Sequence, residues 1–286
     1  MFFIAGITGH VGGAAARHLL GQGKQVRTLL RTPERAKAFA ELGVEIQQGN
    51  LNDANALARA LAGVEGAFLL MQPTMTPPPD FSDAKASLAS YKKALEQTPV
   101  PRLVLLSSMG SEKTERLGNI TATSLMERAM DDLSFPTAFV RAGSFYENYA
   151  SAVSTAQHTG KYFSFQPVDF DFPTVGTVDI GNEVDKLLLS EWTGKRVVEL
   201  GSLTSAKQMA AAVGKVIGRD VEAQAVPQEA WAQTLQQFGL PSGSTKPYEQ
   251  MMESVNNGWI SFGQPDTESV AATQTPEEFF AMVAKQ

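Results

Sequence analysis

The chain has 286 residues, 43% of them hydrophobic, and a net charge of -6 at neutral pH. This length suits one large α/β domain with an appendage or two domains, and the negative charge argues against a nucleic acid or an anionic membrane as the main partner. Because the chain has no cysteine, disulfides, thiolate metal sites and cysteine nucleophiles are excluded. Its three histidines show no metal-ligand spacing, so we expect no metal. The N-terminal apolar run is too short for a signal peptide or a membrane span, which predicts a cytoplasmic protein.

The first thirty-one residues predict a strand, a glycine-rich turn, a helix and a second strand. Residues 2–5 are apolar, Gly6-x-x-Gly9-x-x-Gly12 follows, a helix is expected over 13–20, and residues 26–30 form a second apolar run. This glycine spacing allows a tight turn and close approach of a pyrophosphate to the helix N-terminus. The placement between strand and helix favours a dinucleotide site over a glycine-rich surface turn.

Arg31 ends the second predicted strand, about 20 residues past the glycines, where adenosine ribose is recognised. An acidic residue there would accept a hydrogen bond from the ribose 2′-hydroxyl and favour NAD. Arg31, with Arg35 one helical turn further on, instead offers guanidinium groups that suit a 2′-phosphate. The sequence therefore predicts NADP(H), the alternative being that Arg31 is a solvated charge at a strand end.

Strand and helix patterns alternate from residue 33 to residue 140, which indicates βαβ units with right-handed crossovers. The run 66–71 is continuously apolar, as expected of a strand buried on both faces of a parallel sheet. The proline-rich loop 72–80 follows it and is either the edge of a ligand site or a plain connector. Helices are predicted over 33–42, 54–62, 81–97 and 121–133, and strands over 44–47, 66–71, 103–106 and 136–140.

The second half of the chain is less regular. Residues 162–178 predict loops and short strands, residues 196–201 predict a further strand, and helices are expected over 179–189, 205–217, 228–238, 247–256 and 276–285. The predicted fold is α/β, a Rossmann-type doubly wound parallel sheet with a smaller, mostly helical C-terminal lobe. We expect a cofactor-binding domain over 1–150, with part of 176–202 returning to its sheet, and a substrate-binding lobe over 151–286.

Several motifs along the chain resemble the NmrA-like branch of the atypical short-chain dehydrogenase/reductases. They run in the family's order over nearly the whole chain, as the glycine motif and residues 31–36, 49–53, 106–108, 139–149 and 178–181. Together they are specific for the family and not for a substrate. The layout is similar to members that reduce quinones or triarylmethane dyes with NADPH. The family also contains redox-sensing regulators that bind NADP(H) without turnover.

The resemblance implies contacts with the cofactor at the ends of the predicted strands. These residues are Gly6, Thr8, Gly9, His10, Val11, Gly12, Arg31, Arg35, Asn50, Leu51, Met71, Gln72, Pro73, Ser107, Ser108, Gly143, Ser144 and Phe145. Ser107 and Ser108 would lie near the nicotinamide, and residues 143–145 would close over it. Just past the sixth strand, Tyr146, Asn148 and Tyr149 are the candidate substrate contacts, although Tyr146 suits an ordinary core equally well.

The catalytic residues of the wider superfamily are missing from this chain. No Tyr-x-x-x-Lys occurs, although the lysine of that motif normally lowers the pKa of a tyrosine that acts as acid or base. Many NmrA-like reductases keep Lys-x-x-x-Glu, but alignment on Glu127 puts Thr123 at the lysine position, which leaves Glu127 as a charge on a helix surface. The nearest alternative cations are Lys113 and Arg116. The catalytic residue therefore stays unknown.

This absence narrows the chemistry. Hydride transfer to a quinone, a cationic dye or another conjugated acceptor needs little acid–base help, because the charge is delocalised and water can supply a proton. The sequence favours an NADPH-dependent reductase of a small conjugated acceptor, with a non-catalytic NADP(H) sensor that regulates a partner protein as the alternative. A nucleotide-sugar epimerase is disfavoured, because such enzymes normally need the tyrosine–lysine pair. A homodimer is compatible with the sequence.

Overall fold

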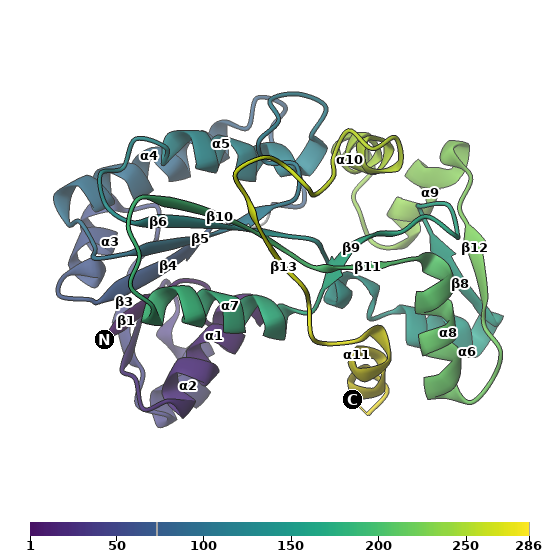
Figure 1. Ribbon diagram of the computed structural model, residues 1–286, viewed down its shortest axis with the longest axis horizontal. Coiled ribbons are helices and arrows are strands. Elements are labelled where there is room, and N and C mark those ends of the chain that lie inside the picture. Colours follow the sequence, from purple (N-terminus) through teal and green to yellow (C-terminus); the bar gives the residue numbers. More distant parts are fainter. Residues whose placement is uncertain (73, 286) are drawn as a thin grey trace.

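A computed structural model describes residues 1–72 and 74–285, so Pro73 lies outside the described residues. One large sheet runs through the molecule (Figure 1). Its strands are β1 Phe2–Ile4, β2 Val26–Leu30, β3 Glu45–Gln48, β4 Gly66–Leu70, β5 Leu103–Ser108, β6 Thr137–Ala142, β10 Lys195–Leu200 and β13 Glu268–Val270. They lie side by side in the order β13-β10-β6-β5-β4-β1-β2-β3, and every pairing is parallel.

Helices cover both faces of this sheet (Figure 1). On one face lie α3 Ala54–Leu61, α4 Ser82–Gln97 and α5 Thr121–Ala129, and on the other lie α1 His10–Gly21, α2 Lys37–Glu41 and α7 Thr177–Leu189. Because successive side chains of a strand point to opposite faces, Phe3 packs in the core under α3–α5 and Ile4 packs in the core under α1 and α7. The expected doubly wound sheet is confirmed.

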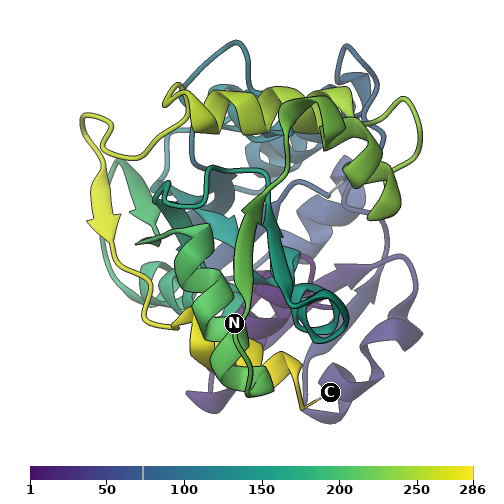
Figure 2. The same cartoon turned by 90° about the vertical axis from the view of Figure 1, so that its right-hand side faces the viewer.

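The chain beyond β6, apart from α7, β10 and β13, builds a smaller lobe. Its helices are α6 Ala152–Thr159, α8 Ala206–Ile217, α9 Trp231–Gln237, α10 Lys246–Asn256 and α11 Pro276–Val283. Its strands are β7 Ser144–Phe145, β8 Lys161–Ser164, β9 Phe172–Val175, β11 Ser202–Thr204 and β12 Glu222–Ala225. Figure 2 looks onto this lobe, with α8 beside the paired β8 and β12. No helix in residues 1–72 or 74–285 is both long and apolar enough to cross a membrane.

Two glycines set how closely α1 is packed. A Cβ atom at Gly12 would collide with the carbonyl oxygens of Ala5 and Gly6, so only glycine lets α1 start so close to β1. On the other side of α1, a Cβ at Gly181 of α7 would lie 2.8 Å from the backbone nitrogen of Ala15. The helix that follows the glycine turn is therefore held between β1 and α7 by backbone contact.

The structure differs from the predicted elements at a few places. The first helix begins at His10, within the glycine motif, and residues 33–42 divide into a 3-10 turn over Pro33–Ala36 and α2. The edge strand β13 was not predicted, because three residues containing Glu268 and Ser269 carry no apolar pattern. Pairing with β10 holds it in place, and Arg196 donates to Glu268 at 2.7 Å.

A carboxyl group is buried where α1 meets α7. The Asp185 side chain is inaccessible to solvent, and its Oδ2 lies 2.7 Å from Nδ1 of His18. Burial raises the pKa of Asp185 from an ordinary 3.8 to about 8. At neutral pH this raised pKa favours the protonated form of the Asp185 carboxyl, which shares a hydrogen bond with the His18 ring.

This pair predicts that stability falls as the pH rises. Between about pH 4 and pH 8 the folded state holds a proton on Asp185 that the unfolded chain has released, so each step upward in pH favours unfolding. Asp185→Asn imitates the protonated acid and does not titrate. Thermal melts from pH 5 to pH 8 should show a steeper fall in Tm for the wild type than for this variant. Parallel slopes would contradict the assignment.

Candidate functional site

The glycine turn leaves the N-terminus of α1 open. The Gly9 N–H donates to the Gly6 carbonyl at 2.9 Å, and the Gly13 N–H donates to the Gly9 carbonyl at 3.0 Å. No side chain within the described chain caps this helix, and residues 8–10 are exposed. The N–H groups of the first turn are therefore free to bind an anion, where the helix dipole also favours negative charge.

A small cavity of 160 Å³ opens beside this turn, and we call it the arginine pocket. Six of the predicted cofactor contacts meet there, namely Gly6, Thr8, Arg31, Arg35, Leu51 and Gln72. Asn50 is not among the described residues that line it, and its Oδ1 accepts a hydrogen bond from the Asn52 N–H at 3.0 Å in the turn before α3. The fold thus brings both arginines to a cavity that adjoins the free end of α1.

A larger cavity of 520 Å³ lies next to the arginine pocket, and Gln72 lines both. We call it the large pocket. Its walls come from the loop after β4, the first turns of α4 and α5, and α10. The predicted contacts Met71 and Gln72 line it, and so do Phe81, Asp83 and Tyr248, which the sequence did not single out. Prolines in the loop after β4 were the one sequence signal that pointed here.

Ser107 and Ser108 lie at the end of β5, level with Arg141 and Ala142 on β6. Ser107 is buried, and its hydroxyl donates to Oε1 of Glu127 at 2.5 Å. The Ser108 hydroxyl lies 3.3 Å from the Met109 carbonyl oxygen. Neither serine lines the arginine pocket or the large pocket as the described residues define them.

The segment after β6 turns into the smaller lobe. A Cβ at Gly143 would lie 2.6 Å from the Pro173 carbonyl oxygen, and Ser144 Oγ lies 2.8 Å from the Tyr149 hydroxyl. Phe145 packs against the core under α1 and α7. The candidate substrate contacts differ in their exposure to solvent. Asn148 is exposed, whereas Tyr146 is buried, and the centroid of its ring lies 5.7 Å from that of the Phe279 ring. Tyr146 therefore lies in the core of the smaller lobe.

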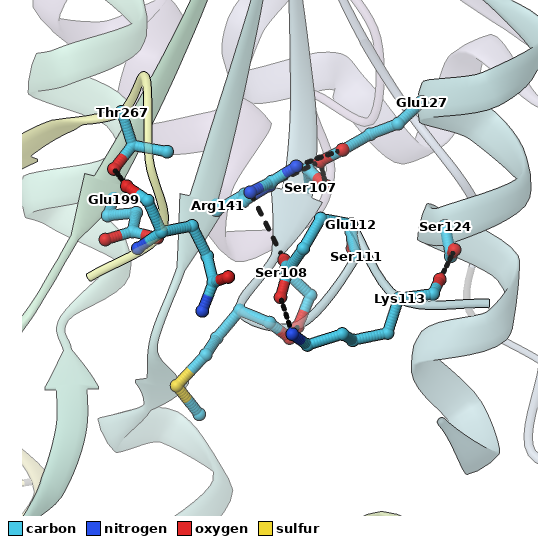
Figure 3. A network of polar contacts seen from close by, with 12 residues as sticks. Ser107, Ser108, Ser111, Glu112, Lys113, Ser124, Glu127, Arg141, Glu199 and Thr267 are labelled. Carbon is cyan, nitrogen blue, oxygen red and sulfur yellow. Dashed lines mark hydrogen bonds and ion pairs between the residues drawn. The ribbon is translucent and has the colours of Figure 1, made fainter. Parts of the chain in front are cut away.

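A buried ionic network underlies the ends of β5 and β6 (Figure 3). Arg141 donates to both carboxylate oxygens of Glu127, at 2.9 and 2.7 Å, and its Nη1 lies 3.2 Å from Glu112. Burial lowers the pKa of Arg141, but the surrounding glutamates outweigh this effect and raise it overall. Glu127 is only 10% exposed. The expectation that it is a helix-surface charge was wrong, because it anchors both Arg141 and Ser107.

Thr123 occupies the position where many family members keep a lysine, and it faces the large pocket. Its hydroxyl donates to the Ile120 carbonyl at 2.9 Å and lies 2.8 Å from Ser111 Oγ. Lys113 and Arg116 instead lie over the Trp259 ring, 5.0 and 5.8 Å from its centroid. Over the chain as described, neither cation lines the two pockets.

Comparison with known proteins identifies the family. The model of the NmrA-like family matches residues 2–260, and the chain belongs to this family. It is 35% identical over 152 residues to a (4-alkanoyl-5-oxo-2,5-dihydrofuran-3-yl)methyl phosphate reductase of Streptomyces griseus, a match that covers 53% of this chain and 50% of that protein. It is 24% identical over 249 residues to quinone oxidoreductase 2 of Escherichia coli, covering 85% of this chain and 84% of the relative.

The fold is shared with solved reductases. A triphenylmethane reductase of a Citrobacter species, solved as a complex with NADP(H), superposes with a TM-score of 0.83. The alignment covers 99% of this chain and 100% of that one at 19% identity. At this identity the similarity establishes the fold and no more.

The buried network predicts a large effect on stability. Arg141→Met leaves the buried Glu127 carboxylate without its cation and Glu112 with Lys113 alone, so we expect the free energy of unfolding to fall by about 3–5 kcal/mol. Lys195→Met is the matched control, because it removes a cation from the exposed pair with Asp131 and should cost less than about 1 kcal/mol. Urea denaturation measures both. Equal losses would contradict a structural role for the network.

Proposed function

We propose that this protein is an NADPH-dependent reductase that transfers hydride to a small conjugated acceptor such as a quinone or a dye. The observation that carries the proposal is the pair of adjoining pockets that share Gln72. One pocket offers two guanidinium groups beside a free helix N-terminus, and the other is large and has no cation among its described lining residues. Phosphates suit the first, and an uncharged ring system suits the second.

The residues of the arginine pocket fit an NADP(H) molecule. Free N–H groups of α1 would hold the pyrophosphate, and the absence of a side chain at Gly12 lets that helix start close to β1. Arg31 and Arg35 would hold the 2′-phosphate, because planar guanidinium groups bind phosphate oxygens in pairs. When bound, NADPH would supply the hydride, and the chain's own task is to bind and orient the two reactants.

The proposed class of acceptor follows from the side chains at the position where many family members keep a lysine. Here that position holds Thr123, whose hydroxyl contacts the Ser111 hydroxyl. Reduction of a quinone to a hydroquinone adds one hydride and one proton, whereas a cationic dye takes up the hydride alone. Thr123 and Ser111 are not cations, and neither ionises near neutral pH. This chemistry suits acceptors whose charge is delocalised and whose proton comes from water. The activities of the related Escherichia coli and Citrobacter proteins support this assignment.

The presence of Thr123 at the lysine position also favours a second candidate function. A protein with Thr123 in place of a lysine is also suited to bind NADP(H) without turnover, as a sensor that regulates a partner protein. The two functions share the arginine pocket and differ in the use of the large one. Oxidation of NADPH by a panel of quinones and triarylmethane dyes separates them. Turnover establishes the reductase, whereas tight NADPH binding with no turnover would overturn it in favour of the sensor.

The cofactor assignment predicts a selective effect of Arg31→Glu. Loss of a charge-assisted hydrogen bond to the 2′-phosphate should weaken NADPH binding by about 10-fold or more, with little change for NADH. Arg59→Glu carries the same charge change on the exposed surface of α3 and should leave both affinities unaltered. Isothermal titration calorimetry gives the dissociation constants. Equal weakening of both cofactors would remove Arg31 from the phosphate site.

A further inference from the structure

The described lining of the large pocket carries a negative charge, whereas the lining of the neighbouring arginine pocket carries positive charges. Among the lining residues of the large pocket that the structure describes, Asp83 is the only charged one. Asp83 lies in the first turn of α4, where the helix dipole favours a negative group and the side chain already supplies it. An anion entering the pocket would therefore meet a carboxylate and find no cation to pair with.

The apolar side of the pocket is formed by the loop after β4 and the start of α4. Met71, Pro77, Pro78 and Phe81 contribute to it. Phe81 has a φ of 53°, a left-handed conformation that bulky residues rarely adopt and that costs about 1–3 kcal/mol. Such strain persists only where the surrounding structure fixes it, and here it fixes the start of α4 beside the pocket. A planar ring system fits between such surfaces.

The polar side of the pocket is built by α10 and the turn Gly118–Ile120. A Cβ at Gly118 would collide with the Pro247 carbonyl, and the Gly118 N–H donates to Oε1 of Gln250 at 3.0 Å. This close contact holds Tyr248 of α10 against Asn119, and both residues line the pocket. Oδ1 of Asn119 is buried without a hydrogen-bond partner in the described chain. Asn119 and Tyr248 thus form the polar end of the pocket.

Tyr248 is suited to donate a hydrogen bond at this end. Burial raises the pKa of its phenol above the ordinary value of 10, and the contact with Asn119 opposes that rise only in part. The phenol therefore keeps its proton throughout the physiological range. A carbonyl oxygen of a bound molecule is the natural acceptor for it.

We propose that the large pocket binds planar aromatic acceptors that are uncharged or cationic, that Asp83 rejects anionic ones, and that Tyr248 donates to the acceptor's carbonyl oxygen. The inference rests on the proposed function in taking the hydride acceptor as the ligand. It assigns Asp83 and Tyr248 as specificity-determining residues. The arginine pocket would therefore bind the negatively charged phosphates of the cofactor. The large pocket would exclude negatively charged acceptors.

Binding to the protein saturated with NADP⁺ tests the charge rule without requiring turnover. The probes are 1,4-naphthoquinone and its 2-sulfonate, which differ by one negative charge. Calorimetry should show the sulfonate binding about 10-fold more weakly to the wild type. Asp83→Asn should reduce this difference to about threefold or less, and Asp83→Lys should reverse it. Asp80→Asn is the matched control, because it removes a carboxylate just before α4 that is not among the described lining residues of the pocket.

A second variant tests the hydrogen bond. Tyr248→Phe should weaken naphthoquinone binding by about 3- to 10-fold, the effect of one lost hydrogen bond. Binding of malachite green, a triarylmethane cation without a carbonyl group, should stay unchanged in this variant. A merely structural role for the phenol would weaken both ligands alike.

The outcomes separate this inference from the proposed function. Selective binding of the uncharged quinone supports the inference, and NADPH oxidation by separate samples of the same protein without NADP⁺ then decides whether the protein is a reductase. Equal binding of the two quinones, a preference for the sulfonate, or binding of neither probe would overturn the inference, whatever the turnover shows.

Discussion

The approach of α1 to β1 at Gly12 is the constraint on which the rest of the site depends. Because glycine leaves no side chain between the helix and the Ala5 and Gly6 carbonyls, the first turn of α1 packs close to the end of β1. Its free N–H groups then lie at the edge of the sheet where the neighbouring parallel strands also end. Arg31, after β2, and Gln72, after β4, reach the same edge from both sides. The backbone packing thus assembles the arginine pocket, our proposed phosphate site, from distant parts of the sequence.

Charge is distributed unevenly along this edge. The exposed Arg31 and Arg35 lie beside the N-terminus of α1, and Asp83 is the one carboxylate among the described residues that line the large pocket. Near the end of β6, the Arg141 guanidinium pairs with Glu127 and Glu112 and so stabilises the packing of the sheet. The chain therefore separates cations that can bind phosphate from those that hold strands together. Such a separation suits a protein that brings an anionic cofactor next to an uncharged acceptor.

The fold and the meeting of Arg31 with the glycine turn could be predicted from the sequence, because both depend on local patterns. The glycine spacing, the apolar runs and Arg31 each act within one βαβ unit. The large pocket could not be predicted, because Asn119 and Tyr248 meet only through the contact of Gly118 with Pro247. Glu127 was misjudged for the same reason: its partner Arg141 lies on another element, and helix periodicity does not reveal it. Tyr146, which follows β6 directly, faces the lobe core through its packing on Phe279.

Direct transfer of hydride is the central claim, and isotope labelling tests it most directly. The protein is incubated with NADPH deuterated at both positions of C4 and with malachite green, whose reduced central carbon does not exchange its hydrogen with water. Mass spectrometry of the colourless product should show one deuterium per molecule. A product that carries hydrogen from the solvent, or a dye that stays coloured while NADPH is bound, would contradict the account.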